Sequence, residues 1–75
     1  MKIVWDDQDS SMKGMFGIHT SEFAYLNKKV IGYTVGYVRN DGQEYVANVI
    51  GGPIQRFKSI DQAKTWFEVC VLLNQ

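Results

Sequence analysis

The chain has 75 residues and a mass of 8.6 kDa, a size that allows one domain over residues 1–75 and excludes a second globular unit. With 45% hydrophobic and 21% charged residues, the composition is typical of a packed protein and excludes a disordered one. Eight Lys and Arg balance eight Asp and Glu, so the formal net charge is zero. The strongly basic footprint of an electrostatic nucleic-acid or membrane binder is therefore absent.

The first third of the chain carries weak signals. Residues 2–5 offer one short strand. Residues 6–20 match neither the period of a strand nor that of a helix, so we expect an irregular loop there. The run Glu22–Leu26 predicts a short strand that turns through Asn27, Lys28 and Lys29 into the next one.

The strongest local signal is a β-hairpin. Two β-rich runs, residues 31–39 and 44–50, flank Asn40, Asp41 and Gly42. A three-residue loop that ends in Gly predicts a type I turn followed by a G1 bulge, with Gly42 in the left-handed region.

The three-residue loop also predicts the register, with Tyr37 opposite Tyr45, Val35 opposite Ala47 and Tyr33 opposite Val49. One face of the hairpin is then wholly apolar or aromatic. A shift to a two-residue Asp-Gly loop would place Asn48 opposite Val35 and mix the two kinds of residue, so the pattern favours the first register. On the leaner face, Gly32 and Gly36 favour a bulky side chain such as Trp5 lying against bare backbone, and the alternative is a flat face open to a partner.

After the hairpin, Ile54–Phe57 offers a further short strand, and Ser59 begins a helix. Gln62 completes a capping-box pattern with Ser59, and Asp61 suits the first turn. Apolar residues then recur with helical spacing, which predicts a helix over about 60–73 lying on the apolar face of the hairpin. The expected fold is α+β: an antiparallel sheet of three to four strands, hairpin 31–39/44–50 included, with one C-terminal helix packed on one face.

The residue types give little support for a catalytic function. His19 is the only histidine and no motif surrounds it, and Cys70 lies on the predicted apolar helix face, where a thiol is usually inert. Asp7, Asp9 and Ser11 imitate the start of a calcium loop, but the later positions hold Met12 and Ile18 where Gly and Glu are needed. We expect no catalytic residues, no metal, no cofactor and no enzyme activity.

Ten aromatic residues in 75 are more than so thin a core can bury. Tyr and Trp left at a rim are typical anchors of protein interfaces, whereas a deep cleft is not expected in so small a unit. The contact residues predicted for a protein partner are Tyr25, Arg39, Glu44 and Arg56. The lone Cys70 and the lack of a long apolar run favour a cytoplasmic protein outside the membrane.

Residues 31–73, a hairpin followed by Phe-Lys-Ser-Ile-Asp-Gln-Ala-Lys entering a helix, resemble the latter two-thirds of a double-stranded-RNA-binding domain, and equally the partial version of that fold in HicB-type antitoxins. The family places a lysine cluster at the start of that helix, where this chain has only the flanking Lys58 and Lys64. The resemblance implies nucleic-acid binding, the less favoured alternative, through Lys28, Lys29, Arg39, Arg56 and Lys58.

A second resemblance is to the small, disulfide-free accessory proteins of bacteriophages and mobile elements, which act by binding one host protein. It implies a phage-encoded inhibitor or modulator of a host protein in the host cytoplasm, acting by steric masking. A third alternative is a self-associating structural protein, with an edge strand or the flank formed by Trp66, Val69 and Leu72 as the interface between copies.

Overall fold

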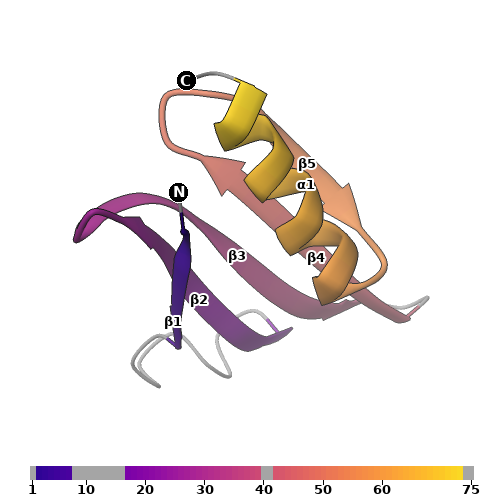
Figure 1. Cartoon of the computed structure of the whole chain (residues 1–75). Coiled ribbons are helices and arrows are strands. Elements are labelled where there is room, and N and C mark those ends of the chain that lie inside the picture. The colour runs from indigo at the N-terminus through magenta and orange to yellow at the C-terminus, as the bar shows by residue number, and fades with distance from the viewer. Residues whose placement is uncertain (1, 8–16, 40–41, 74–75) are drawn as a thin grey trace.

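The computed structural model describes residues 2–7, 17–39 and 42–73. They form one antiparallel sheet and one helix (Figure 1). The predicted α+β class is confirmed, but the sheet has five strands rather than three to four. In chain order the elements are β1 (Val4–Asp7), β2 (Ile18–Leu26), β3 (Lys29–Arg39), β4 (Gly42–Val49), β5 (Ile54–Phe57) and α1 (Ile60–Leu73).

The strands follow one another across the sheet in chain order, each antiparallel to its neighbour. A tight turn joins β2 to β3, with Asn27 and Lys28 at φ values of 53° and 67°, the backbone twist that suits a two-residue hairpin loop. The expected loop over 6–20 is wrong at both ends, because Asp6 and Asp7 belong to β1 and residues 18–20 open β2. Its middle, with Asp9 and Ser11, lies outside the described residues.

The β3–β4 hairpin has a different register from the predicted one. Arg39 pairs with Gly42, so the loop holds two residues, and Tyr37 faces Glu44 instead of Tyr45. Gly42 does have a positive φ, 121°, but it opens β4 rather than forming a bulge; the predicted turn at 40–41 lies outside the described residues. A slip of one residue turns β4 over relative to β3, because successive side chains point to opposite faces.

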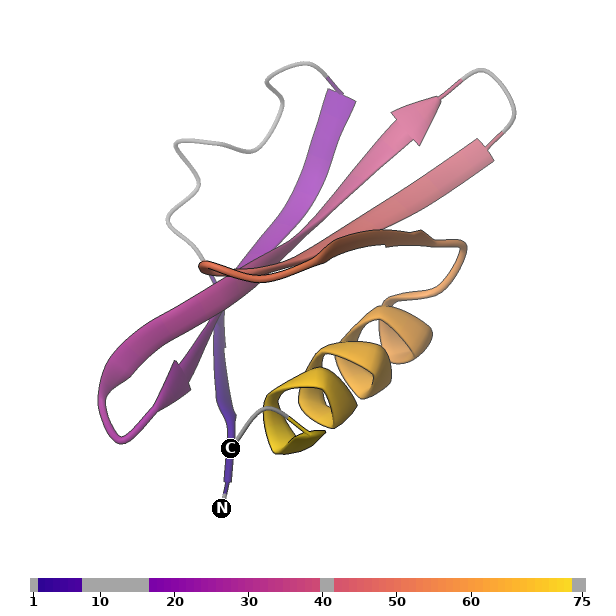
Figure 2. The same cartoon turned by 90° about the horizontal axis from the view of Figure 1, so that it is seen from above.

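As a result, α1 covers the side of β3 that was predicted to be lean. Tyr45, Ala47 and Val49 of β4 lie on the helix side, as expected, but β3 contributes Gly32, Thr34 and Gly36 there. The predicted packing of the helix on Tyr33, Val35 and Tyr37 is therefore wrong. Figure 2 shows the helix lying along one side of the strongly twisted sheet.

The bare backbone of β3 explains this choice. A Cβ atom at Gly32 would overlap the ring of Phe67 from α1, and one at Gly36 would lie 2.7 Å from Cε1 of Tyr45. The bulky side chains against the glycines are thus Phe67 and Tyr45 rather than Trp5. Phe67 and Ala63 of the helix form the fully buried core with Ala24 of β2 and Ala47 of β4.

The helix begins where the sequence predicted. The Ser59 hydroxyl oxygen accepts hydrogen bonds from the backbone N–H groups of Asp61 and Gln62, at 3.2 and 3.5 Å, and α1 runs over Ile60–Leu73. These bonds satisfy two donors that a helix N-terminus leaves unpaired.

Polar contacts then fasten the helix to the first two strands. Trp5 packs edge-on against Phe67, with ring centroids 5.1 Å apart, and its indole N–H donates to Glu68 at 3.1 Å. Lys64 lies over the Trp5 ring and pairs with Glu22 at 2.8 Å. The helix is therefore held at β1 and β2 as well as at the centre of the sheet.

Candidate binding face

The face of the sheet that points away from α1 is the candidate functional site, and we call it the open face. The register places cross-strand neighbours on this side together: Phe23 opposite Tyr33, Val35 opposite Val46, and Tyr37 opposite Glu44. No helix or strand of the described residues covers it. The residues of the open face that the register brings together are Ser21, Phe23, Tyr33, Val35, Tyr37, Arg39, Glu44, Val46, Asn48, Ile54 and Arg56.

Three aromatic rings form a connected group on the open face. The ring of Phe23 meets that of Tyr25 at a centroid distance of 6.4 Å and that of Tyr33 at 6.5 Å. Asn48 donates a hydrogen bond from its amide nitrogen to the Tyr33 hydroxyl oxygen at 3.2 Å. Edge-on and tilted ring contacts of this kind hold each side chain in one orientation. All three rings are partly exposed, so the group offers fixed apolar surface.

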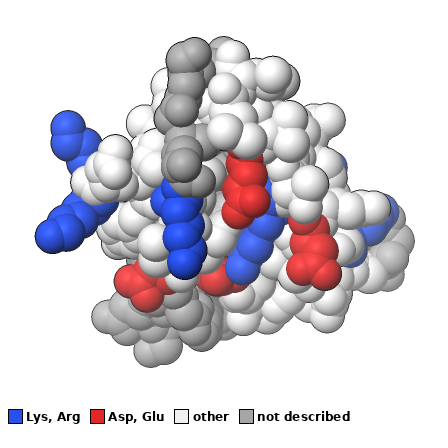
Figure 3. Space-filling model, viewed as in Figure 1, with Lys and Arg blue, Asp and Glu red and all other residues white. Residues whose placement is uncertain are grey.

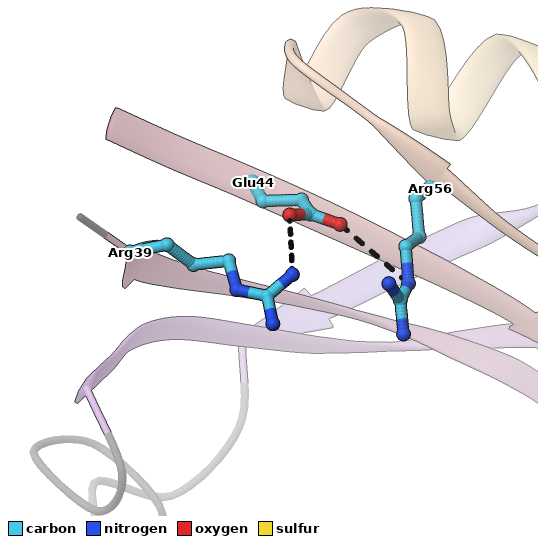
Figure 4. Close-up of polar contacts among 3 residues, drawn as sticks. All are labelled: Arg39, Glu44 and Arg56. Atoms are coloured by element: carbon cyan, nitrogen blue, oxygen red, sulfur yellow. Dashed lines mark hydrogen bonds and ion pairs between the residues drawn. The ribbon is translucent and has the colours of Figure 1, made fainter. Parts of the chain in front are cut away.

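A charged cluster lies at the other end of the open face, shown in Figure 4. Glu44 accepts from Arg39 at 3.2 Å with one carboxylate oxygen and pairs with Arg56 at 3.5 Å through the other. The Arg39 guanidinium also lies 5.6 Å from the centroid of the Tyr37 ring.

The two arginines cover the carboxylate. The Glu44 side chain is only 13% exposed, whereas those of Arg39 and Arg56 are 50% and 66% exposed. Exposed ion pairs add little to stability, but these hold two guanidinium groups beside one carboxylate. The Arg56 side chain is the most exposed of the three and is therefore the group best placed to meet a carboxylate of a partner.

Four contact residues were predicted from the sequence, and the structure places all four on the open face. Arg39, Glu44 and Arg56 meet in the charged cluster, although β3, β4 and β5 supply one each. Tyr25 lies on β2 beside Phe23, within the aromatic group. Whether they bind a partner stays a prediction.

The basic residues predicted for nucleic acid do not form one patch. Lys28 and Lys29 lie at the β2–β3 turn, and Arg39 lies at the far end of β3. Eleven residues of strand separate the two ends, a distance of roughly 30 Å at the usual rise per residue. Arg56 and the exposed Lys58 belong to the end that carries Arg39.

Sequence reasoning assigned Tyr33, Val35 and Tyr37 to the core and so missed them as candidate binding residues. Phe23, which contacts Tyr33, was also missed. A signal was present in the alternation of β3, where Gly, Thr and Gly separate the bulky residues. A row of small residues on one side of a strand favours close approach of a helix on that side, which leaves the bulky row on the other.

His19 and Cys70 lie in different parts of the fold. His19 lies on β2 with its ring edge-on to Tyr45, at a centroid distance of 5.7 Å. Cys70 lies in α1 beside Val71 and lines a groove described below. Within residues 2–7, 17–39 and 42–73, no three His, Cys, Asp or Glu side chains gather in a way that could hold a metal ion.

Comparisons with known proteins found no matching family model, no matching curated protein and no matching solved structure. Among the described residues, no helix has both the length and the apolar character needed to cross a bilayer.

Proposed function

We propose that this protein is a non-enzymatic binding module that docks one protein partner on the open face. The observation that carries the proposal is a sheet face, not covered by any helix or strand of the described residues, that holds fixed aromatic rings at one end and a preassembled Arg–Glu–Arg cluster at the other. Tyr and Arg are the residue types that most often dominate binding energy at protein interfaces.

Preorganisation supports the same proposal. Phe23, Tyr33 and Tyr37 stand on strands, and their rings already have neighbours that limit rotation. A rigid aromatic anchor loses little conformational entropy when a partner covers it. The partner we propose has an apolar area for these rings and at least one carboxylate for the exposed guanidinium group of Arg56.

In this proposal the module acts by covering a surface of its partner. The resemblance to small phage proteins extends the proposal to a host protein as the partner and to inhibition or modulation as the effect. The genes beside this one test that extension: phage early genes support it, and a toxin gene supports an antitoxin instead.

The test is affinity capture from bacterial lysate, followed by a titration with the purified partner. We expect one stoichiometric partner, and Tyr37→Ala is expected to weaken its binding about 30-fold, the effect of losing about 2 kcal/mol at a dominant contact. Arg56→Glu should weaken it too, because it reverses an exposed charge. Thr65→Ala, on the exposed side of α1, is the matched control and should bind like the wild type. Capture of no stoichiometric partner, or equal binding by all variants, would contradict the proposal.

Single-stranded nucleic acid is the second candidate, favoured by one observation: Tyr37 and two arginines lie together on an antiparallel sheet face that no helix or strand of the described residues covers. Aromatic rings on such a surface can stack on bases. The candidate predicts binding of a labelled oligonucleotide whose affinity falls steeply with salt. No binding of single-stranded or duplex probes at low salt would remove it.

A further inference from the structure

The flank of α1 that faces β5 carries an apolar stripe on the outside of the molecule. Trp66, Val69 and Leu73 are spaced i, i+3 and i+7, so they follow one side of the helix. Trp66 rests against Phe57 of β5, with ring centroids 5.6 Å apart, while Val69 and Leu73 are 47% and 79% exposed. Apolar side chains repeated at this spacing are the pattern by which one helix packs on another.

An apolar groove of about 470 Å³ adjoins this stripe at the C-terminal end of α1. Its wall combines the helix, the start of β3 and the connection between β4 and β5, and none of the residues that line it is charged. Ile50 at its rim is 61% exposed. The lining residues are Val30, Ile31, Val49, Ile50, Gly51, Gly52, Pro53, Cys70 and Val71.

The charged side chains avoid this part of the surface. In Figure 3, blue and red atoms occupy the middle, the lower part and the sides of the view, and the upper surface beside the grey atoms, near the C-terminal end of α1, is largely white. We call the stripe and the groove together the apolar flank. Uncharged surface of this kind, next to a polar surround, marks an interaction site.

We propose that the apolar flank binds a second copy of this chain, related to the first by a two-fold axis. A two-fold contact brings the same patch of both copies together, so the patch must be complementary to itself. The apolar flank meets this requirement because it holds both a projection, Leu73, and a recess, the groove. It also lacks charges that would repel their own copies, and the zero net charge of the chain removes long-range repulsion.

The helix sets how the two copies align in the proposed dimer. When two α1 helices meet stripe against stripe, Val69 and Leu73 of each copy are removed from water, and each Leu73 enters the groove of the other copy. Leu72, grouped with this stripe on the sequence, is offset from Leu73 by about 100° around the helix and lines a depression with Lys2, Ile3 and Glu68. It takes no part in the proposed contact.

This dimer does not depend on the proposed function. The apolar flank lies on the helix side of the sheet and the open face lies on the other side, so a dimer leaves two open faces free. A bivalent particle that binds two partner sites at once would gain avidity.

Sedimentation equilibrium tests the proposal with a matched pair of variants, Leu73→Lys and Leu72→Lys. Both replace an exposed leucine of α1, so both variants are expected to fold. The wild type and Leu72→Lys should sediment with twice the 8.6 kDa chain mass. Leu73→Lys should sediment as a monomer, because the two-fold axis sets each new charge in an uncharged recess of the other copy.

A wild type that stays a monomer at millimolar concentration would overturn the proposal and would leave a foreign apolar helix as the occupant of the flank. A dimer that survives in Leu73→Lys would place the contact elsewhere, for example on an edge strand. Partner capture separates this result from the proposed function: Leu73→Lys should still bind the captured partner, and Tyr37→Ala should still dimerise.

Discussion

Gly32 lies where Phe67 of α1 meets the sheet, and its missing side chain makes room for that ring. A Cβ atom there would overlap the Phe67 ring and the carbonyl oxygen of Asn48. Close packing leaves such a site little freedom to adjust. Glycine at position 32 is therefore required by packing, because its φ does not lie in the left-handed region.

Gly32→Ala is expected to lower the free energy of unfolding. Overpacking costs about 1–3 kcal/mol, which exceeds the gain of about 0.4–1 kcal/mol from a stiffer unfolded chain. Gly52→Ala is the control, since its Cβ would lie 3.4 Å from Val49 in ordinary contact, and only the small gain should appear. Urea unfolding measures both; equal effects at the two positions would contradict the packing argument.

Thr34 is buried on the helix side of β3, and its hydroxyl makes no hydrogen bond to any described residue. A hydroxyl that is buried without a partner loses its hydrogen bonds to water and gains none within the protein. We therefore expect Thr34→Val, which keeps the shape, to raise the free energy of unfolding by about 1 kcal/mol. Thr65→Val, at an exposed position of α1, should change it by less than about 0.5 kcal/mol. A loss of stability in Thr34→Val would show that the hydroxyl has a partner after all.

At the scale of elements, α1 is attached to the sheet by two kinds of contact. Phe67 and Ala63 fill the small-residue face, and Lys64 and Glu68 reach β1 and β2 through Trp5 and Glu22. The first contact is apolar and fixes which face is covered. The second is polar and lies at the rim, so it helps to set the direction of the helix across the strands.

A double-mutant cycle with Lys64→Met and Glu22→Gln measures the polar contact. Both side chains are partly exposed, so solvent screening limits the pair to a coupling of about 0.5–1 kcal/mol. In about 1 M salt, where the Debye length is about 3 Å, the coupling should shrink. A coupling of zero at low salt would mean that the apolar contact alone holds the helix.

At the scale of the whole molecule, the single helix leaves two surfaces with different chemistry. The open face combines aromatic rings with an ion-pair cluster, and the apolar flank has no charged lining residue in its groove. The part of the chain that the structure describes has one helix with which to cover one side of a five-stranded sheet. Small size therefore explains why the described residues leave apolar surface exposed that one small core cannot bury.

Self-association also predicts how thermal stability responds to concentration. If native copies pair and unfolded chains do not, mass action raises the melting temperature as protein is added. The wild type should melt several degrees higher after an increase of about 100-fold in concentration, and Leu73→Lys should not. Scanning calorimetry or circular dichroism checks this, and a wild-type melting temperature that does not move would count against the dimer.

Local chemistry accounts for what could be predicted of the fold. The helix over 60–73 and its cap at Ser59 were predicted correctly because capping bonds join neighbours in sequence. The strand Ile54–Phe57 was also found from its local pattern. Of the candidate site, Arg39, Glu44 and Arg56 were predicted as contact residues, and the structure brings them together in one cluster; Tyr33 and Tyr37 were placed in the core instead, and Phe23 was missed.

The class of fold, the helix and its start, and the alternating rows of residues on β3 could all be predicted from the sequence alone. Which of those rows the helix covers depends on a contact between residues far apart in the chain. The reason is physical: a strand with bulky side chains on one side and glycine on the other is compatible with burial of either. Phe67 of α1, far along the chain, selects the glycine side because its ring fits against bare backbone, and that contact leaves the tyrosines of β3 facing outward.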